Sequence, residues 1–458
     1  MQTVMSSIEA ARDDPRSLEE LYRSAVTSGD EPLFVDAIAA LLVRYPDNLL
    51  LQAWSHRLDI AREPGPSTGT AEIAQHATRR HWLAAILTSA ALGLTFVFLT
   101  WEMAGRLADP ASPRFLLGWA PATAAAVLVF SYATGPDKRR LQLYVGALLL
   151  LALLFGLAAW EGWVPLAAMR DADREPAGLA QAWLIALHLP FVCWGVLAGA
   201  MCATLGDLWR QVFAFVAKSA ETIVTAGLYV IAGGVFTGLT VGIFRALGVT
   251  LSEELVVRFV CWGAGAIPVL AVATVYDATG APADQEWQTG LARVIRILVR
   301  LLLPLTIGVL LVYDAYFIPT QFMKAFTQRE TLIIYNVTIV AIIAVLAVAA
   351  PGLDERLAGR GSQILRLAIM AAAILTLLLN VYALAAIVSR TISGGYTPNR
   401  HAVIGWNVVT LAMLGRVLTR QALAKGRPWA DVWRRSMAQA LVLAVVWSAW
   451  VVVGLPHF

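Results

Sequence analysis

Charged residues are scarce in this chain. Asp, Glu, Lys and Arg make up 14% of its 458 residues, whereas soluble domains carry about a quarter. Hydrophobic residues account for 59%. This composition excludes an ordinary soluble domain. The net charge of +4 comes from arginines that flank apolar runs, so it predicts no nucleic-acid partner.

Cysteine and catalytic motifs are also sparse. The three cysteines, Cys193, Cys202 and Cys261, all lie inside apolar runs, which predicts neither disulfides nor a zinc site. The six histidines are scattered, and the sequence has no His-Glu-x-x-His, Gly-x-Ser-x-Gly or Walker motif. We therefore predict no metal, no cofactor and no catalytic residues.

The N-terminal segment lacks the apolar core of a secretory signal, so we predict no cleavable leader. Residues 1–62, called the headpiece below, show short helical patterns separated by Gly-Asp and Pro-Asp-Asn turns, with Ser17 as the first N-cap. We expect a small soluble helical unit that resembles a fragment of a tetratricopeptide hairpin. Residues 63–78 predict a flexible linker.

Runs of about 20 apolar residues dominate residues 79–458. A bilayer offers no water to backbone N–H and C=O groups, so apolar segments of this length form helices. We predict an all-α polytopic membrane protein with about eleven transmembrane helices. The predicted spans cover residues 82–104, 115–134, 141–164, 179–205, 219–247, 253–277, 291–317, 331–351, 364–389, 401–420 and 436–455.

Basic residues favour one side of the predicted spans. Arg79 and Arg80 precede the first span, and the run Lys138-Arg139-Arg140 follows the second. Loops on this side carry more Arg and Lys near the span ends than loops on the other side, which is the positive-inside pattern. An odd number of spans then predicts a cytoplasmic headpiece and a periplasmic C-terminus.

Charged side chains inside apolar spans are costly, and they indicate functional sites. Arg258 lies one turn inside the sixth predicted span, and Asp314 lies at the outer end of the seventh. His188 in the fourth span is interpreted as a satisfied interior histidine. If these spans adjoin, Arg258, His188 and the carboxylates of Asp314, Glu102 and Glu161 converge on one outward-facing polar pocket. For Glu102 and Glu161, each of which follows a Trp at a span end, the alternative is a solvated acid at the membrane interface. The alternative is that Arg258 extends to the lipid headgroups.

Three glycines at four-residue spacing, Gly234, Gly238 and Gly242, line one face of the fifth predicted span. Such a stripe lets a second helix backbone approach closely. We predict a helix-packing surface here. The alternative is a sliding surface for a conformational change.

The stretch TISGGYTPNRHAVIGWN interrupts the apolar sequence between the ninth and tenth predicted spans. Gly394 and Gly395 suit a helix end, Thr397 suits an N-cap, and Pro398 suits the first helical position. A helix stop and restart therefore explains the segment.

The same turn gathers polar residues on the predicted outer side: Arg390, Asn399, Arg400 and His401. Exposed N–H groups at a helix N-terminus carry partial positive charge and bind anions. We therefore predict that these residues bind an anionic lipid headgroup or a small anionic solute. Simple helix capping is the alternative.

The stretch YTPNR at residues 396–400, followed by HAVIGW, resembles a segment near the end of a family of bacterial multipass membrane proteins, domain of unknown function 4153. Together with the many-span hydropathy, the resemblance covers residues 80–458. It implies a bacterial inner (cytoplasmic) membrane protein and implies no activity.

Two function classes remain open, and a membrane-embedded lipid-modifying enzyme is a less supported third. The first is a transporter or lipid-handling protein, indicated by the outer arginines and by the pentamer FVCWG, which occurs in the fourth and sixth spans. The second is a scaffold or sensor that docks a cytosolic protein through the headpiece. Near the middle of the spans only Asn336 and Asn380 are strongly polar, which argues against proton-driven antiport.

Overall fold

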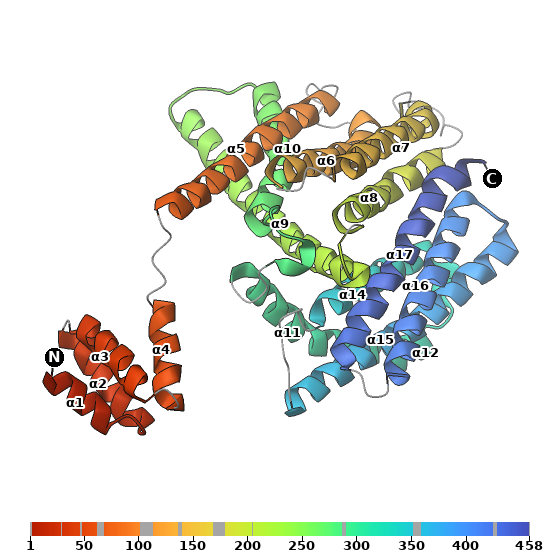
Figure 1. Ribbon diagram of the computed structural model, residues 1–458. Coiled ribbons are helices and arrows are strands. Elements are labelled where there is room, and N and C mark those ends of the chain that lie inside the picture. The colour runs from red at the N-terminus through yellow and green to blue at the C-terminus, as the bar shows by residue number, and fades with distance from the viewer. Residues whose placement is uncertain are drawn as a thin grey trace. The chain divides into compact units, whose positions relative to one another are not determined.

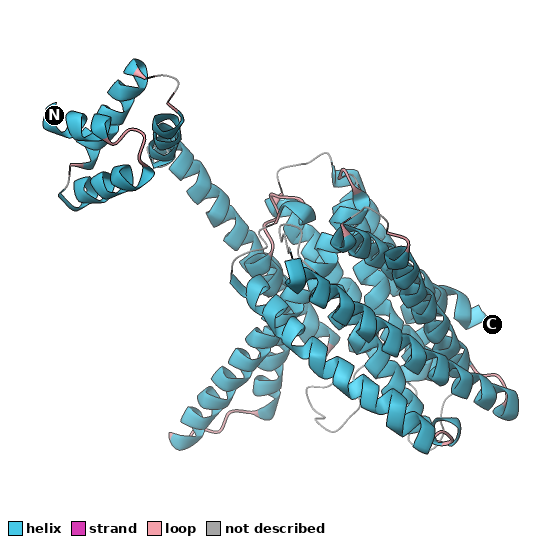
Figure 2. Cartoon of the chain, turned by 90° about the horizontal axis from the view of Figure 1, so that it is seen from below, coloured by secondary structure: helices cyan, strands magenta, loops and turns pink. Residues whose placement is uncertain are grey.

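The computed structural model describes residues 2–457 apart from residues 29, 46–47, 62–67, 101–112, 136–139, 168–178, 204, 286–289, 351–358 and 425–427. Within these residues every regular element is a helix, which confirms the predicted all-α class (Figure 2). The chain divides into two compact units, Met1–Arg79 and Arg80–Phe458. Each unit has a hydrophobic core of its own.

The described part of the headpiece contains the helices α1 (Gln2–Ala10), α2 (Pro15–Ser28), α3 (Glu31–Arg44) and α4 (Leu49–Ala61). The first of these has no counterpart among the predicted helices. Asp14, rather than the predicted Ser17, caps α2. Its carboxylate accepts hydrogen bonds from the Arg16 backbone N–H at 3.1 Å and from the Ser17 hydroxyl at 2.6 Å.

All four helices contribute to the core of the headpiece, whose members include Ile8, Leu18, Phe34, Leu41, Leu51 and Trp54. Arg57 of α4 stacks over the Trp54 ring at 4.4 Å from its centroid. The same guanidinium donates to Glu19 of α2 at 2.5 Å. An apolar core and a cross-helix ion pair therefore hold α4 against the rest of the headpiece.

Eleven helices in the described residues are long and apolar enough to cross a membrane, which confirms the predicted number. They are α5 (Thr68–Leu99), α6 (Pro113–Thr134), α7 (Leu141–Ala167), α8 (Leu179–Cys202), α9 (Leu208–Ala246), α10 (Glu253–Val275), α11 (Gly290–Val312), α14 (Arg329–Ala349), α15 (Gly359–Gly394), α16 (Pro398–Ala422) and α17 (Trp429–Ala449).

Short elements follow some of these helices. They are the 3-10 turns η4 (Pro282–Asp284) and η7 (Leu455–His457), the π-helical turns η5 (Tyr313–Phe317) and η6 (Trp450–Gly454), and the short helices α12 (Ile318–Thr320) and α13 (Lys324–Thr327). The start of α5 at Thr68 corrects the predicted linker, because residues 68–78 are helical. This stretch contains Ala, Glu and Gln, which favour helix. Residues 62–67 lie outside the described residues.

Two helices are much longer than their predicted spans. α9 has 39 residues and α15 has 36, which correspond to about 58 and 54 Å at 1.5 Å per residue. The hydrocarbon core of a bilayer measures about 30 Å. In α9 the added residues are N-terminal, because Asp207 caps the helix by accepting from the Trp209 backbone N–H at 3.2 Å. The first half of α9 is buried, whereas the second half is largely exposed.

The membrane-spanning unit contains two groups of helices (Figure 1). In the first group, α6, α7 and α8 pack around a core that includes Leu128 and Ile185. In the second group, α11, α14, α15, α16 and α17 pack around a core that includes Ala373 and Trp433. Contacts between α17 and α8 connect the two groups. α9 also contacts both α8 and α17. α10 packs chiefly against α9 and α6.

Basic side chains bind the carbonyl ends of helices to which they do not belong. Arg80 donates to a carbonyl at the end of α6 (2.6 Å), Arg300 to the last carbonyl of α14 (3.4 Å), and Arg366 to a carbonyl at the end of α16 (3.2 Å). The last carbonyls of a helix lack intrahelical partners and carry partial negative charge. These arginines therefore close helix ends and join segments that are distant in sequence.

The ion pair between Glu19 and Arg57 predicts how acid affects the headpiece. A hydrogen bond from Arg57, and to a smaller extent one from Arg23, lowers the pKa of the Glu19 carboxyl below its usual value. A carboxyl with a lower pKa in the folded state stabilises the fold at neutral pH, and this contribution is lost as the pH falls through that folded pKa. Acidification below about pH 4 should therefore destabilise a purified fragment of residues 1–62, as measured by urea unfolding followed by circular dichroism.

Glu19→Gln should be less stable than the parent at pH 6 and should lose less stability on acidification. The matched control is Glu20→Gln, because Glu20 pairs with Arg16 one turn away on the same exposed helix face. This control should keep the parental acid profile. An unchanged profile in Glu19→Gln would contradict the stabilising role of the Arg57 contact.

Candidate functional site

The turn between α15 and α16 is built as the sequence predicts. α15 ends at Gly394, and Gly395 has a φ of +79°, a conformation that is strained for residues with a Cβ. The Thr397 hydroxyl accepts a hydrogen bond from the Arg400 backbone N–H at 3.3 Å, and Pro398 occupies the first position of α16. The helix stop and restart is confirmed.

The predicted anion-binding residues of this turn differ in what they contact. The Arg400 guanidinium donates to the backbone carbonyl of Gly395, and a Cβ on Gly394 would come within 2.8 Å of it. Arg400 therefore closes the carbonyl end of α15. Arg390, in the last turns of α15, keeps a buried Nη1 with no hydrogen-bond partner among the described residues. Asn399 is half-buried at the second position of α16.

His401, in the first turn of α16, lies among aromatic side chains. Trp450 donates its indole N–H to Nε2 at 3.3 Å, the Tyr396 hydroxyl bonds to Nδ1, and the Trp447 ring lies 5.5 Å away between centroids. An indole N–H can only donate, so Nε2 accepts and the ring proton of neutral His401 is on Nδ1. Both ring nitrogens are thus engaged within the chain.

His188 of α8 forms a second histidine–tryptophan pair. Trp406 of α16 donates to His188 Nε2 at 2.6 Å, and the Nδ1–H bonds to the backbone carbonyl of Leu184 at 2.7 Å. His188 is 5% exposed, and the geometry again fixes the proton on Nδ1. It is a satisfied interior histidine, as the sequence predicts, and it joins α8 to α16.

Arg258 lies in a different environment from the turn. It pairs with Glu254 one turn earlier on α10, and both side chains are exposed. α10 packs chiefly against α9 and α6, whereas α16 packs chiefly against α17 and α15. This helix packing does not favour a single pocket shared by Arg258 and the α15–α16 turn.

Asp314 lies within the π-helical turn η5, just after α11. Both carboxylate oxygens are buried and have no hydrogen-bond partner among the described residues. π-helical turns inside longer helices occur frequently at functional sites. Asp314 therefore remains a candidate for ligand contact, although its carboxylate makes no hydrogen bond to the α15–α16 turn in the described part of the chain.

The glycine stripe on α9 faces open space. A Cβ on Gly234, Gly238 or Gly242 would meet no atom within 4 Å among the described residues, and all three glycines are exposed. The predicted helix-packing surface is therefore not used within the described chain. The stripe lies in the second half of α9, which is largely exposed.

Close helix packing occurs at other glycines instead. A Cβ on Gly265 of α10 would lie 2.8 Å from the Cα of Gly93 on α5, and a Cβ on Gly405 of α16 would lie 1.8 Å from the Trp447 ring of α17. At these distances a Cβ would clash, so only the hydrogen side chain of glycine fits. Gly405 thus lets Trp447 reach the aromatic cluster around His401.

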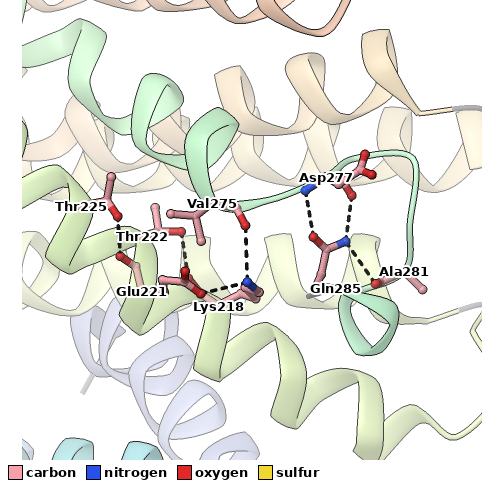
Figure 3. Close-up of polar contacts among 8 residues, drawn as sticks. All are labelled: Lys218, Glu221, Thr222, Thr225, Val275, Asp277, Ala281 and Gln285. Atoms are coloured by element: carbon pink, nitrogen blue, oxygen red, sulfur yellow. Dashed lines mark hydrogen bonds and ion pairs between the residues drawn. The ribbon is translucent and has the colours of Figure 1, made fainter. Parts of the chain in front are cut away.

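A buried ion pair on α9 is the polar feature that the sequence interpretation missed (Figure 3). Lys218 is 5% exposed and Glu221 is 8% exposed, and Lys218 Nζ lies 2.9 Å from Glu221 Oε2. Lys218 also donates to the carbonyl of Val275, the last residue of α10, at 3.4 Å. The cation thereby closes the C-terminus of α10.

The loop after α10 folds against the same part of α9 (Figure 3). The Gln285 side chain accepts from the Asp277 backbone N–H and donates to the Asp277 carbonyl, both at 2.8 Å. The Gln211 side chain of α9 accepts from the Ala283 backbone N–H at 2.9 Å. Together with Lys218, these contacts fix the end of α10 and the following loop to the buried half of α9.

The spacing Lys218-Ser219-Ala220-Glu221 was the available signal for this pair, because residues three apart lie on one helix face. The fifth predicted span begins at residue 219, which leaves Lys218 outside it. The helix begins at Leu208, however, so Lys218 lies in its third turn among buried neighbours. Placing the helix start too late concealed the pair.

No family model, no curated protein and no solved structure matches this chain. The resemblance to domain of unknown function 4153 therefore stays a prediction.

The buried pair predicts strong coupling between Lys218 and Glu221. Lys218→Met removes the cation beside the buried Glu221 carboxylate, so this substitution alone should cost about 3–5 kcal/mol. Glu221→Gln breaks the same pair from the other side. The double variant should cost much less than the sum of the two. Guanidinium unfolding of the purified protein in detergent, arranged as a double-mutant cycle, measures this coupling.

Glu254→Gln is the matched control, because it breaks the exposed Arg258–Glu254 pair on α10. Exposed pairs of this spacing contribute about 0.3–0.5 kcal/mol. Additive effects of the Lys218 and Glu221 substitutions would show that the pair does not act as a unit.

Proposed function

We propose that this protein is a transporter or lipid-handling protein of a bacterial inner membrane, which binds an anionic solute or headgroup at the turn between α15 and α16. The eleven long apolar helices within its described residues support an integral membrane protein. A protein that moves a polar substrate needs polar groups inside its helix bundle, whereas a simple membrane anchor does not.

The observation that carries the proposal is a pair of buried, unpaired donors at one end of the α15–α16 hairpin. Arg390 Nη1 and Trp447 Nε1 have no hydrogen-bond partner among the described residues. Each buried unpaired donor costs about 1–3 kcal/mol, a cost that an accepting ligand offsets. The N-terminus of α16 lies at the same end and favours negative charge. Donors of this kind match the oxygens of a phosphate or carboxylate.

A scaffold or sensor is the second candidate, because the headpiece has an apolar core of its own. A docking unit must fold without help from the spans. In this function the headpiece binds a cytosolic protein, and the unpaired donors at the α15–α16 turn have no ligand.

Anion binding is tested with inorganic phosphate and with nanodiscs that contain phosphatidylglycerol. Arg390→Gln removes a charged donor, and a hydrogen bond to a charged group contributes about 1.5–3 kcal/mol. The apparent affinity for the anion should therefore fall about 10- to 100-fold. Thermal unfolding in detergent, titrated with phosphate at constant ionic strength, measures this change for the solute. Lipid retention from the nanodiscs measures it for the headgroup.

Arg245→Gln is the matched control, since Arg245 lies at the end of α9, away from the α15–α16 turn. It should bind as the parent does. Equal affinities of the parent and Arg390→Gln would refute anion binding at this turn. Loss of the cellular phenotype on deletion of residues 1–62, with Arg390→Gln silent, would favour the scaffold.

The orientation of the spans has a separate test. An odd number of crossings with a cytoplasmic headpiece puts the C-terminus in the periplasm. Alkaline phosphatase fused after Phe458 should therefore be active, whereas the same enzyme fused before residue 1 should be inactive. The reverse result would put the α15–α16 turn on the cytoplasmic side.

A further inference from the structure

Three asparagines and one threonine meet inside the second helix group, and we call these four residues the amide cluster. Asn336 comes from α14, Asn380 from α15, and Asn407 and Thr410 from α16. Asn380 is 0% exposed and Asn407 is 1% exposed. Apolar residues of the same three helices surround them. Polar side chains this deep in a membrane protein are costly, and they mark functional sites.

The hydrogen-bond donors of the amide cluster are largely engaged. Asn380 donates to the Thr410 hydroxyl, and Asn407 donates to Asn336 Oδ1 at 2.7 Å. Asn336 and Asn407 each donate to the backbone carbonyl four residues earlier, at 2.7 and 2.8 Å. The Thr410 hydroxyl donates to a carbonyl of its own helix. The N–H and O–H groups thus hold the three helices together.

The acceptors of the amide cluster are not engaged in the same way. Asn380 Oδ1 and Asn407 Oδ1 are buried, and neither has a hydrogen-bond partner among the described residues. Asn407 and Thr410 lie three residues apart on one face of α16, and such residues have Cβ atoms about 5–6 Å apart. The Asn380 side chain contacts Thr410, which places it within about one turn of Asn407 along α16. The unpaired oxygens Asn380 Oδ1 and Asn407 Oδ1 therefore belong to neighbouring side chains. Paired buried acceptors require an explanation such as a bound ion.

The balance of donors and acceptors favours a cation. A water molecule that donated to both oxygens would leave its own lone pairs with few donors to accept from, because the N–H and O–H groups of the cluster are engaged. A hard cation needs only oxygens. No carboxylate belongs to the cluster, and the described residues contain no group of three or more His, Cys, Asp or Glu that could hold a metal. Divalent cations usually take carboxylate ligands, so neutral amide and hydroxyl oxygens suit a single charge.

We propose that the amide cluster binds a monovalent cation of the size of Na⁺ through Asn380 Oδ1 and Asn407 Oδ1. The bound ion links α15 to α16, and through Asn336 it also affects α14. The site is distinct from the α15–α16 turn, where the unpaired groups are donors. Its assignment does not depend on anion binding at that turn.

The test is thermal unfolding of the purified full-length protein in detergent, with NaCl exchanged for choline chloride at constant ionic strength. Na⁺ should raise the unfolding temperature in a saturable manner, because a ligand that binds only the folded state stabilises it. Asn380→Leu should abolish the response. Asn380→Asp keeps the oxygen and adds a negative charge, so it should tighten the apparent affinity about tenfold.

Ser448→Ala is the matched control. Ser448 of α17 is buried, and its hydroxyl donates to the carbonyl of Ala444 on its own helix. This variant should keep the Na⁺ response. Asp314→Asn should keep it too, since Asp314 lies outside the cluster.

Three results would overturn the proposal. The first is an equal unfolding temperature in NaCl and choline chloride for the parent. The second is loss of the response in Asp314→Asn, which would assign the ion to that carboxylate. The third is an Asn380→Asp variant whose apparent affinity for Na⁺ equals that of the parent. This result decides the question if Asn380→Leu does not fold.

Discussion

A polar group inside a bilayer has no water to bind, and this constraint accounts for most of the side-chain contacts in the membrane-spanning unit. Buried hydroxyls such as those of Thr225, Thr376 and Ser448 donate to the carbonyl four residues earlier on their own helix. Longer polar side chains reach other helices. The apolar surface alone does not hold the helices together, because lipid tails are as apolar as the helix faces; tight packing and these polar contacts do.

The last carbonyls of a helix lack partners within the helix, so the need to satisfy polar groups also applies to helix ends. Four carbonyl ends, those of α6, α10, α14 and α16, receive a basic side chain from another segment: Arg80, Lys218, Arg300 and Arg366, respectively. All four lie on the side that the sequence predicts to be cytoplasmic. The excess of basic residues on that side therefore has a structural cause as well as a topological one, because a cation both favours the inner side and closes a helix dipole.

The polar groups without partners are the ones that point to function. Near the α15–α16 turn they are donors, on Arg390 and Trp447, and in the amide cluster they are the acceptors of Asn380 and Asn407. His188 and His401 differ from both sets, because each has both ring nitrogens engaged by neighbours that include a tryptophan. Opposite hydrogen-bonding character at two places in one helix group is consistent with ligands of opposite charge.

The sequence by itself determined the helical membrane class, the number of spans and the Gly395–Thr397 turn, because these depend on length, hydropathy and local backbone preference. Only the tertiary structure decided that Lys218 and Glu221 are buried, that Gly234 faces open space and that Asn380 meets Thr410. A membrane span is apolar on every face, so its sequence carries little information on which face meets another helix. Partners of polar side chains therefore depend on helix neighbours that only the folded chain defines.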